Sequence, residues 1–115
     1  MKKLISNNER FFIAGSQGMV GKAVLRSLKK SGYGREEIGG VILKPSKKEL
    51  NLLNLDDVDN WFQTKKPTVV VLAAAKVGGI FANNSQPADF ILENLKIQNN
   101  VIEMAHKYQV KRFLF

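Results

Sequence analysis

Short apolar runs alternate with longer amphipathic stretches along the chain. The second and third runs are continuous and apolar, which is typical of strands buried on both faces of a parallel sheet. We expect four strands, at residues 11–14, 40–43, 69–73 and 110–115. Between them, apolar residues recur every three or four positions, which predicts helices. We expect three, over residues 19–31, 55–65 and 87–108.

The alternation of strands and helices predicts an α/β fold with a parallel sheet and helices on both faces. We expect a Rossmann-type sheet with strand order 3-2-1-4, which places the fourth strand beside the first and the ligand crevice between their carboxyl ends. A chain of 115 residues holds one domain at most. Its last apolar strand would leave an exposed sheet edge. We therefore expect residues 1–115 to be the N-terminal part of a Rossmann domain in a longer protein.

Local signals mark the ends of two helices. Gly32 follows the first helix, where glycine is a common C-terminal cap. Asn54 precedes the second helix, where its side chain can accept a hydrogen bond from a first-turn N–H. We interpret Trp61 as a core residue. The inward stripe of the second helix is Leu55, Val58, Trp61 and Phe62. The first helix carries four apolar residues on one face, Val20, Val24, Leu25 and Leu28.

Polar side chains interrupt the apolar face predicted for the longest helix. A buried amide without a partner costs about 1–3 kcal/mol, so Asn94 and Gln98 each need a backbone partner or a ligand, and both interpretations stay open. His106 lies near the helix C-terminus, which favours capping or surface exposure over catalysis. The predicted stripe is Phe90, Ile91, Asn94, Gln98, Val101, Ile102 and Ala105.

Three glycines at a spacing of three punctuate the stretch between the first strand and the first helix. One glycine allows the tight turn, the second lets the backbone approach a phosphate, and the third allows the helix to pack closely on the strand. The N–H groups at the helix start then point at a bound anion. The pattern favours a dinucleotide pyrophosphate site over a plain strand–turn–helix connection. Its residues are Gly15, Ser16, Gln17, Gly18, Met19, Val20 and Gly21.

The charge after the second strand bears on which dinucleotide binds. NAD-binding domains usually place an acidic residue there for the ribose 2′-hydroxyl. This chain has Lys44 at that position, followed by Lys47 and Lys48. Because a lysine attracts the 2′-phosphate that a carboxylate would repel, the sequence favours NADP over NAD.

Composition excludes several kinds of site and partner. The chain has no cysteine and one histidine, so disulfides, thiolate metal sites and histidine-rich metal sites are excluded. No apolar run reaches the roughly 18 residues of a membrane span, and the N-terminus lacks a signal-peptide core; we expect a cytoplasmic protein with no membrane partner. The net charge of +8 could indicate nucleic-acid binding. Since the lysines are scattered, with no basic stripe along a helix, we predict no nucleic-acid partner.

A more specific pattern follows the third strand. It runs Leu72-Ala73-Ala74-Ala75-Lys76-Val77-Gly78-Gly79-Ile80, then Ala82-Asn83-Asn84 and Pro87-Ala88-Asp89-Phe90. With the glycine turn and the stretch Glu49-Leu50-Asn51-Leu52-Leu53, it closely resembles the GDP-L-fucose synthases. These are NADPH-dependent 3,5-epimerase/4-reductases of GDP-4-keto-6-deoxy-mannose, in the extended short-chain dehydrogenase/reductase superfamily. The resemblance covers residues 11–115.

The resemblance implies roles for individual residues. The glycine turn would hold the NADP pyrophosphate, and Lys44 would approach the 2′-phosphate. Asn51 and Leu52 would contact the adenine. Family members carry arginine where this chain has Gln17. The ribose and nicotinamide side would be lined by Ala73, Ala74 and Ala75.

The resemblance also implies a GDP-sugar substrate and a homodimer for the full-length protein. Catalysis in the family needs a serine-containing loop and a Tyr-x-x-x-Lys pair, whose tyrosine donates a proton. Neither tyrosine of this chain fits, because Glu37 follows Tyr33 and Arg112 follows Tyr108 at that spacing. We therefore assign no catalytic residue and no metal ligand, and expect these residues alone to be inactive. Another nucleotide-sugar epimerase, reductase or dehydratase, or a non-catalytic nucleotide-binding module, remains an alternative.

Overall fold

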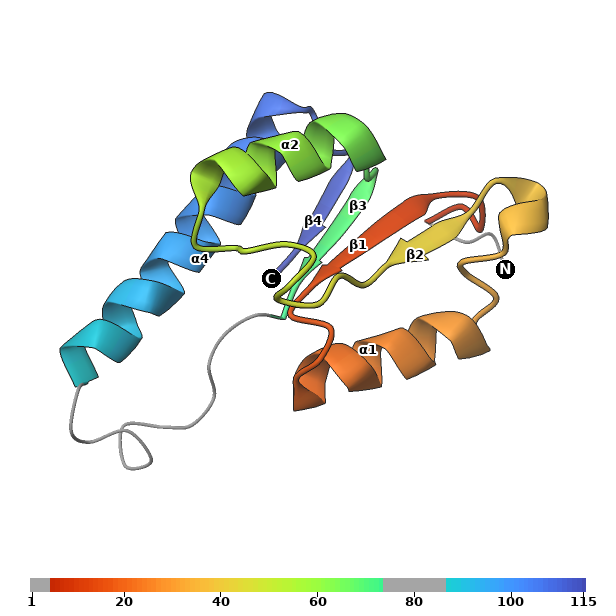
Figure 1. Ribbon diagram of the computed structural model, residues 1–115. Coiled ribbons are helices and arrows are strands. Elements are labelled where there is room, and N and C mark those ends of the chain that lie inside the picture. The colour runs from red at the N-terminus through yellow and green to blue at the C-terminus, as the bar shows by residue number, and fades with distance from the viewer. Residues whose placement is uncertain (1–4, 74–86) are drawn as a thin grey trace.

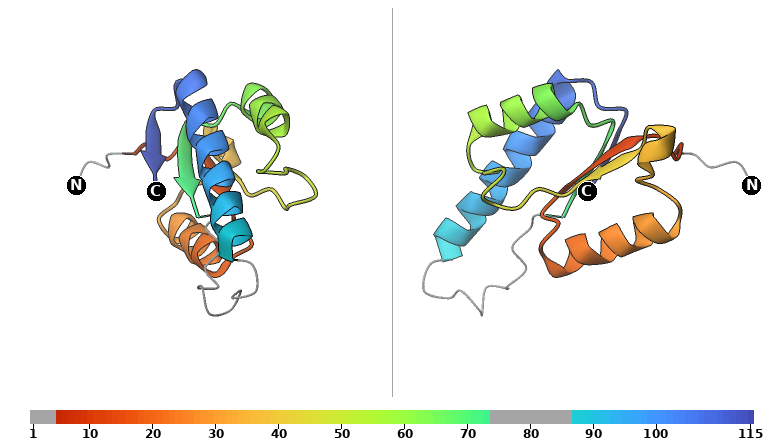
Figure 2. Two further views of the ribbon diagram at one scale, coloured as in Figure 1. Left: turned by 90° about the vertical axis from the view of Figure 1, so that its left-hand side faces the viewer. Right: turned by 45° about the vertical axis from the view of Figure 1, so that its right-hand side comes forward.

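A four-stranded parallel sheet forms the centre of the computed structural model, which describes residues 5–73 and 87–115. Its strands are β1 (Arg10–Ala14), β2 (Val41–Leu43), β3 (Val69–Leu72) and β4 (Arg112–Leu114). The described helices are α1 (Met19–Lys30), the 3-10 turn η1 (Glu36–Ile38), α2 (Leu55–Lys65) and α4 (Pro87–Lys107). One face of the sheet is covered by α1 and the other by α2 and α4 (Figures 1 and 2). The predicted α/β fold class is confirmed.

The strands are arranged in the order β2-β1-β3-β4. Phe12 of β1 lies opposite Leu43 of β2 and Val70 of β3, and Val70 lies opposite Phe113 of β4. The expected Rossmann arrangement is confirmed, and the strand beside β1 on this side is the third of this chain and not the fourth. The observed order is the Rossmann order 3-2-1-4-5 without its outer strand. The outer strand is missing because residues 44–54 form turns instead of a strand.

The core lies between the sheet and the layer formed by α2 and α4. The Phe12 ring lies 5.6 Å from that of Phe62 and 5.5 Å from that of Trp61, measured between centroids. Trp61 is half-buried and packs against this core, as predicted. The buried cluster is Phe12, Ala14, Leu50, Val58, Phe62, Val70, Leu72, Ile97, Val101, Met104 and Ala105.

The outer strands are less buried than their apolar sequences predict. All three residues of β2 are half-buried, so the expectation of a strand buried on both faces is wrong there. Leu114 of β4 is 46% exposed. Both strands lie at sheet edges, where a strand has a neighbour on one side only.

The predicted helix caps are confirmed. Gly32 has φ +89°, and its N–H donates to the Lys29 carbonyl at 3.1 Å, which closes the end of α1. The Asn54 side chain accepts a hydrogen bond from the Asp57 N–H at 3.1 Å at the start of α2. In the described part of the chain, no helix is long and apolar enough to cross a membrane.

The buried face of α4 differs in phase from the predicted stripe. Val101 and Ala105 are buried as expected, but Ile91 and Ile102 are exposed. Asn94 and Gln98 are half-buried beside the buried face. This difference follows from packing. Because α4 contacts both α2 and β3, the helix buries the side that faces both of them. The buried residues of α4 are Ile97, Val101, Met104 and Ala105.

A hydrogen-bonded ionic cluster joins α2 to the end of α4. The Tyr108 hydroxyl donates to the Asp59 carboxylate, and Lys107 Nζ lies 3.1 Å from Asp59 Oδ1. The hydrogen bond from Tyr108, followed by that from Lys107, holds the pKa of Asp59 below its ordinary value. The same carboxylate raises the pKa of Tyr108 and of Lys107. The Asp59 contribution to stability is therefore present above the unfolded pKa of the carboxyl and is lost as the pH falls through the folded pKa.

We predict that Asp59→Asn lowers the midpoint of thermal unfolding at pH 7, and that the difference from wild type shrinks as Asp59 becomes protonated. Circular dichroism melts between pH 7 and about pH 3 measure this difference. Asp56→Asn, in the first turn of the same helix, is the control and should show a smaller pH-dependent change. A difference that stays constant across this range would contradict the assignment.

Candidate functional site

The end of β1 runs directly into a tight turn that leads to α1. Gly15 has φ +88°, a conformation that glycine adopts without strain. The Gly18 N–H donates to the Gly15 carbonyl at 3.2 Å and closes the turn. Gly18 is also the N-cap of α1, and no side chain caps the helix. The first N–H groups of α1 thus form a positive helix end without a built-in acceptor.

The glycines divide the work of the turn between them. A Cβ at Gly21 would lie 2.1 Å from the Gly15 carbonyl oxygen and 2.7 Å from Ser16 Cα, so no side chain fits there. A Cβ at Gly18 would lie 3.7 Å from its nearest neighbour, the Gly15 oxygen, so the fold alone leaves space for one. Gly21 therefore allows the helix to pack on the turn, and Gly18 keeps the surface before the helix open to a ligand.

The other residues of the turn differ in burial. Ser16 is buried, and its Oγ has no hydrogen-bond partner among the residues that the structure describes. Gln17 is exposed, as are Met19 and Val20, the latter two by 88% and 52%. Val20 was predicted to share one helix face with Val24, Leu25 and Leu28, which are half-buried, but Val20 itself is exposed. The site thus combines the unpartnered hydroxyl of Ser16 with exposed neighbouring residues.

Three strands end beside the glycine turn. Ala14, Leu43 and Leu72 are the last residues of β1, β2 and β3, whose parallel direction places their carboxyl ends at one edge. The Ala73 N–H donates to the Ala14 carbonyl at 2.8 Å, so Ala73 lies beside the start of the turn. Ala74 and Ala75 lie outside the described residues.

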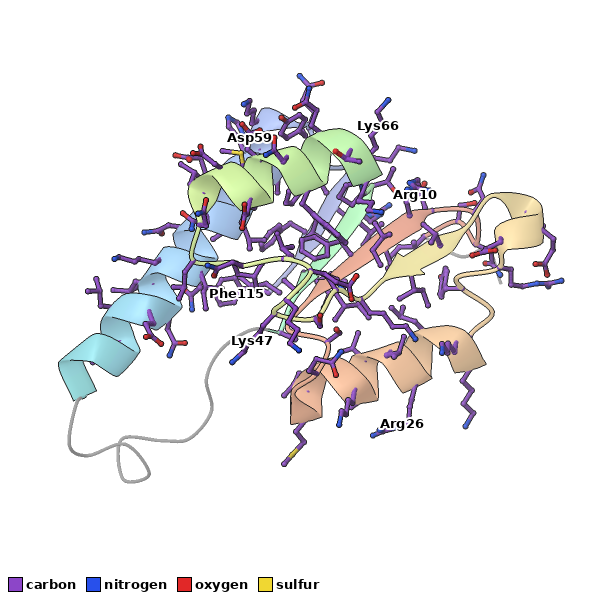
Figure 3. The ribbon with its side chains drawn as sticks, in the orientation of Figure 1. Arg10, Arg26, Lys47, Asp59, Lys66 and Phe115 are labelled. Carbon is purple, nitrogen blue, oxygen red and sulfur yellow. The ribbon has the colours of Figure 1, made fainter. Side chains whose placement is uncertain are left out.

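A loop carrying positive charge leaves the end of β2. Its shape is fixed by a reciprocal contact, in which Ser46 N–H donates to a Glu49 carboxylate oxygen and Glu49 N–H donates to Ser46 Oγ, each at 3.3 Å. Lys44, Lys47 and Lys48 are all exposed on this loop. Figure 3 shows Lys47 at the end of the sheet where α1 begins. The loop therefore brings cationic side chains to the same edge as the glycine turn.

The next turn carries Asn51 and Leu52. The Asn51 side chain accepts a hydrogen bond from the Leu53 N–H at 3.1 Å, which forms an Asx turn. The Leu52 carbonyl accepts one from Asn100 Nδ2 of α4 at 2.9 Å. Sequence analysis did not single out Asn100; its position next to the buried Val101 was the available signal.

Basic residues gather on the solvent face of α1, contrary to the prediction that no helix carries a basic stripe. They are spaced at three or four residues or adjacent, all are exposed, and the helix has no acidic residue. Arg26 points away from the sheet in Figure 3. Such a surface attracts anions at long range without defining a site. The residues are Lys22, Arg26, Lys29 and Lys30.

Residues 11–115 match the family described as NAD dependent epimerase/dehydratase. The chain belongs to the NAD dependent epimerase/dehydratase family. Within it, the chain is similar to GDP-L-fucose synthase 1 of Arabidopsis thaliana, with 44% identity over 115 residues, 100% of the chain and 34% of the relative. It is also 44% identical to GDP-L-fucose synthase of Escherichia coli over 110 residues, 95% of the chain and 32% of that relative. The chain spans about a third of the length of these curated relatives.

Several solved structures have the same fold as this chain. DdhaC gives a TM-score of 0.87 at 42% identity, over 96% of this chain and 30% of its own. A GDP-D-glycero-L-gluco-heptose synthase of Campylobacter jejuni, solved in the presence of NADPH, gives 0.86 at 36% identity, over 98% and 31%. A GDP-mannoheptose C4 reductase of the same organism, with NADP bound, gives 0.83 at 37% identity, over 95% and 32%. The Rossmann-type assignment is confirmed.

We predict that alanine at Gly21 and at Gly18 separates folding from binding. Gly21→Ala should destabilise the chain by about 1–3 kcal/mol, because the methyl group meets backbone atoms that must shift. Gly18→Ala should change stability by no more than about 0.5 kcal/mol and weaken dinucleotide binding instead. Urea unfolding measures the first effect and titration calorimetry with NADPH the second. Equal stability losses for the two variants would show that the division of roles is wrong.

Proposed function

We propose that this chain is the cofactor-binding part of an NADPH-dependent epimerase/reductase that converts GDP-4-keto-6-deoxy-mannose to GDP-L-fucose. The proposal includes a homodimeric complete enzyme, as the resemblance implies. The observation that carries it is the glycine turn before α1, built at the same sheet edge as the lysine-bearing loop after β2. Family membership and the GDP-L-fucose synthase relatives support the substrate class.

The residues present fit an NADP-type dinucleotide. The open surface at Gly18, the start of α1 and the unpartnered hydroxyl of Ser16 suit a pyrophosphate, which offers only acceptor oxygens. Lys44 and the lysines that follow it suit a ribose 2′-phosphate. Ala73, whose side chain is one methyl group, leaves space beside the end of β1. NADPH held there supplies the hydride for reduction of a ketone.

A second substrate is favoured by the solved structures. Two of the matching Campylobacter jejuni enzymes, the GDP-D-glycero-L-gluco-heptose synthase and the GDP-mannoheptose C4 reductase, have 36% and 37% identity and TM-scores of 0.86 and 0.83. A GDP-L-fucose synthetase from Naegleria fowleri, bound to NADP, has 29% identity and a TM-score of 0.74. Reduction of a GDP-4-keto-heptose with NADPH is therefore the second candidate, and it would use the same cofactor site.

We predict that the chain binds NADPH more tightly than NADH and that Lys44→Glu removes this preference. The substitution places a carboxylate where the 2′-phosphate lies, so NADPH affinity should fall about tenfold or more while NADH affinity changes little. Titration calorimetry with both nucleotides measures the ratio. Lys96→Glu makes the same charge change at an exposed position on α4 and serves as the matched control. Equal losses for the two variants would leave only a general charge effect and refute the role of Lys44.

We predict that the protein encoded by the complete reading frame oxidises NADPH with GDP-4-keto-6-deoxy-mannose and releases GDP-L-fucose. Gly18→Ala in that protein should raise the KM for NADPH, because the added methyl group obstructs the surface before α1. The absorbance of reduced nicotinamide at about 340 nm measures NADPH oxidation and the KM. Chromatography of the sugar nucleotide identifies the product. Preferential turnover of a GDP-4-keto-heptose would select the second candidate. Nucleotide binding without turnover of either substrate would instead indicate a non-catalytic module.

A further inference from the structure

Asn100 of α4 bonds to a loop that is distant in sequence. Its Nδ2 donates to the Leu52 carbonyl at 2.9 Å, across a separation of 48 residues. Asn100 is half-buried and follows the buried Ile97 by one helical turn, next to the fully buried Val101. The Asn100 amide therefore extends from a packed part of the helix to the backbone of the turn at residues 51–53.

The turn that receives this hydrogen bond is otherwise held mainly by contacts within itself. Asn51 Oδ1 accepts the Leu53 N–H at 3.1 Å, and the Asn51 carbonyl accepts the Asn54 N–H at 3.0 Å. Contacts of this kind set the shape of a turn but move with it. Leu50, the residue before the turn, is buried in the core. The hydrogen bond from Asn100 holds the other end of the turn. Together they define where the backbone of residues 51–53 lies.

The position of this turn connects it to one half of the cofactor. In Rossmann-type sheets the adenosine lies on the side of the second strand, because the residue after that strand contacts its ribose. Residues 51–53 follow β2, and the neighbouring Leu50 packs in one cluster with Ala14 and Leu72, the last residues of β1 and β3. The turn thus lies at the carboxyl edge, on the adenosine side.

We propose that Asn100 is a positioning residue for the adenine ring, acting through the Leu52 carbonyl. By holding that carbonyl, its amide keeps the backbone of residues 51–53 in the place where a planar ring can contact it. The inference rests on the proposed function, since it needs a dinucleotide at the glycine turn. It assigns to α4 a part in recognising adenine that is exerted through the turn.

The amide is chemically suited to this role. It donates to the Leu52 carbonyl without carrying a charge into a half-buried position. A carboxylate at residue 100 would face the same carbonyl with two acceptor oxygens, and leucine would leave the carbonyl without this donor. Asn99, the preceding residue, is exposed and has the same side chain. The chain therefore offers a matched control position for the aspartate and leucine substitutions.

The test uses three ligands that separate the halves of the cofactor. NADPH carries both halves, adenosine 2′,5′-bisphosphate the adenine half, and reduced nicotinamide mononucleotide the other half. Each is titrated calorimetrically into the wild-type chain and into Asn100→Asp, Asn100→Leu, Asn100→Gln and the controls Asn99→Asp and Asn99→Leu. Circular dichroism melts of every variant accompany the titrations.

We expect Asn100→Asp and Asn100→Leu to weaken binding of NADPH and of the bisphosphate by about fivefold, with the mononucleotide unchanged. Asn100→Gln retains an amide donor and should recover part of the loss, and the Asn99 variants should stay within about twofold. Unchanged affinity for the bisphosphate in folded Asn100 variants overturns the inference, as does a parallel loss for the mononucleotide. Failure of the wild-type chain to bind NADPH refutes the proposed cofactor site itself.

A measurement on the wild-type chain keeps the inference testable if the variants do not fold. Side-chain amide resonances of Asn99 and Asn100 are followed by NMR during addition of adenosine 2′,5′-bisphosphate. We expect a shift at Asn100, because the ligand contacts the backbone that its amide holds, and none at Asn99. Saturating ligand that leaves the Asn100 amide resonances unmoved would refute the assignment.

Discussion

The close approach of α1 to the end of β1 is the constraint on which the rest of the site depends. The helix begins so near the turn that a single Cβ at Gly21 would lie 2.1 Å from the Gly15 carbonyl oxygen. This contact fixes the direction of α1, and with it the place to which the first N–H groups of the helix point. An anion site built from backbone needs such rigidity, since peptide groups cannot adjust as side chains do. The absence of a side chain at Gly21 therefore fixes the direction in which the N–H groups after Gly18 point.

The position of β1 extends this constraint to the other parts of the site. β1 lies between β2 and β3 and pairs in parallel with both, so the glycine turn lies between the ends of those two strands. The loop after β2 carries the lysines, and Ala73 directly follows β3. Burial of Phe11 and Phe12 in the strand holds it in the core. A strand that is central to the sheet thus brings three separate segments to one edge.

Features set by neighbouring residues could be predicted from the sequence, and features set by distant packing could not. Gly32 and Asn54 cap their helices through bonds that span only a few residues, so a local pattern identifies them. The rotation of α4 depends on α2 and β3, and periodicity alone placed Ile102 on the wrong face. The hydrogen bond of Asn100 spans 48 residues and has no local signature. The expected Rossmann order is confirmed, and only the numbering of the strands differs, since turns at residues 44–54 take the place of the outer strand.

The two halves of the candidate site rely on different physics and so respond differently to their surroundings. In the proposed site, the glycine turn would act by its shape and by fixed peptide dipoles close to the pyrophosphate, which salt screens little. Lys44, Lys47 and Lys48 are exposed, and at physiological ionic strength charges of this kind are screened beyond about 8 Å. Each lysine is also a point charge without the planar fork of arginine. In the proposed site, discrimination between NADP and NAD should therefore weaken with rising salt, whereas affinity for the pyrophosphate they share should depend mainly on an intact turn.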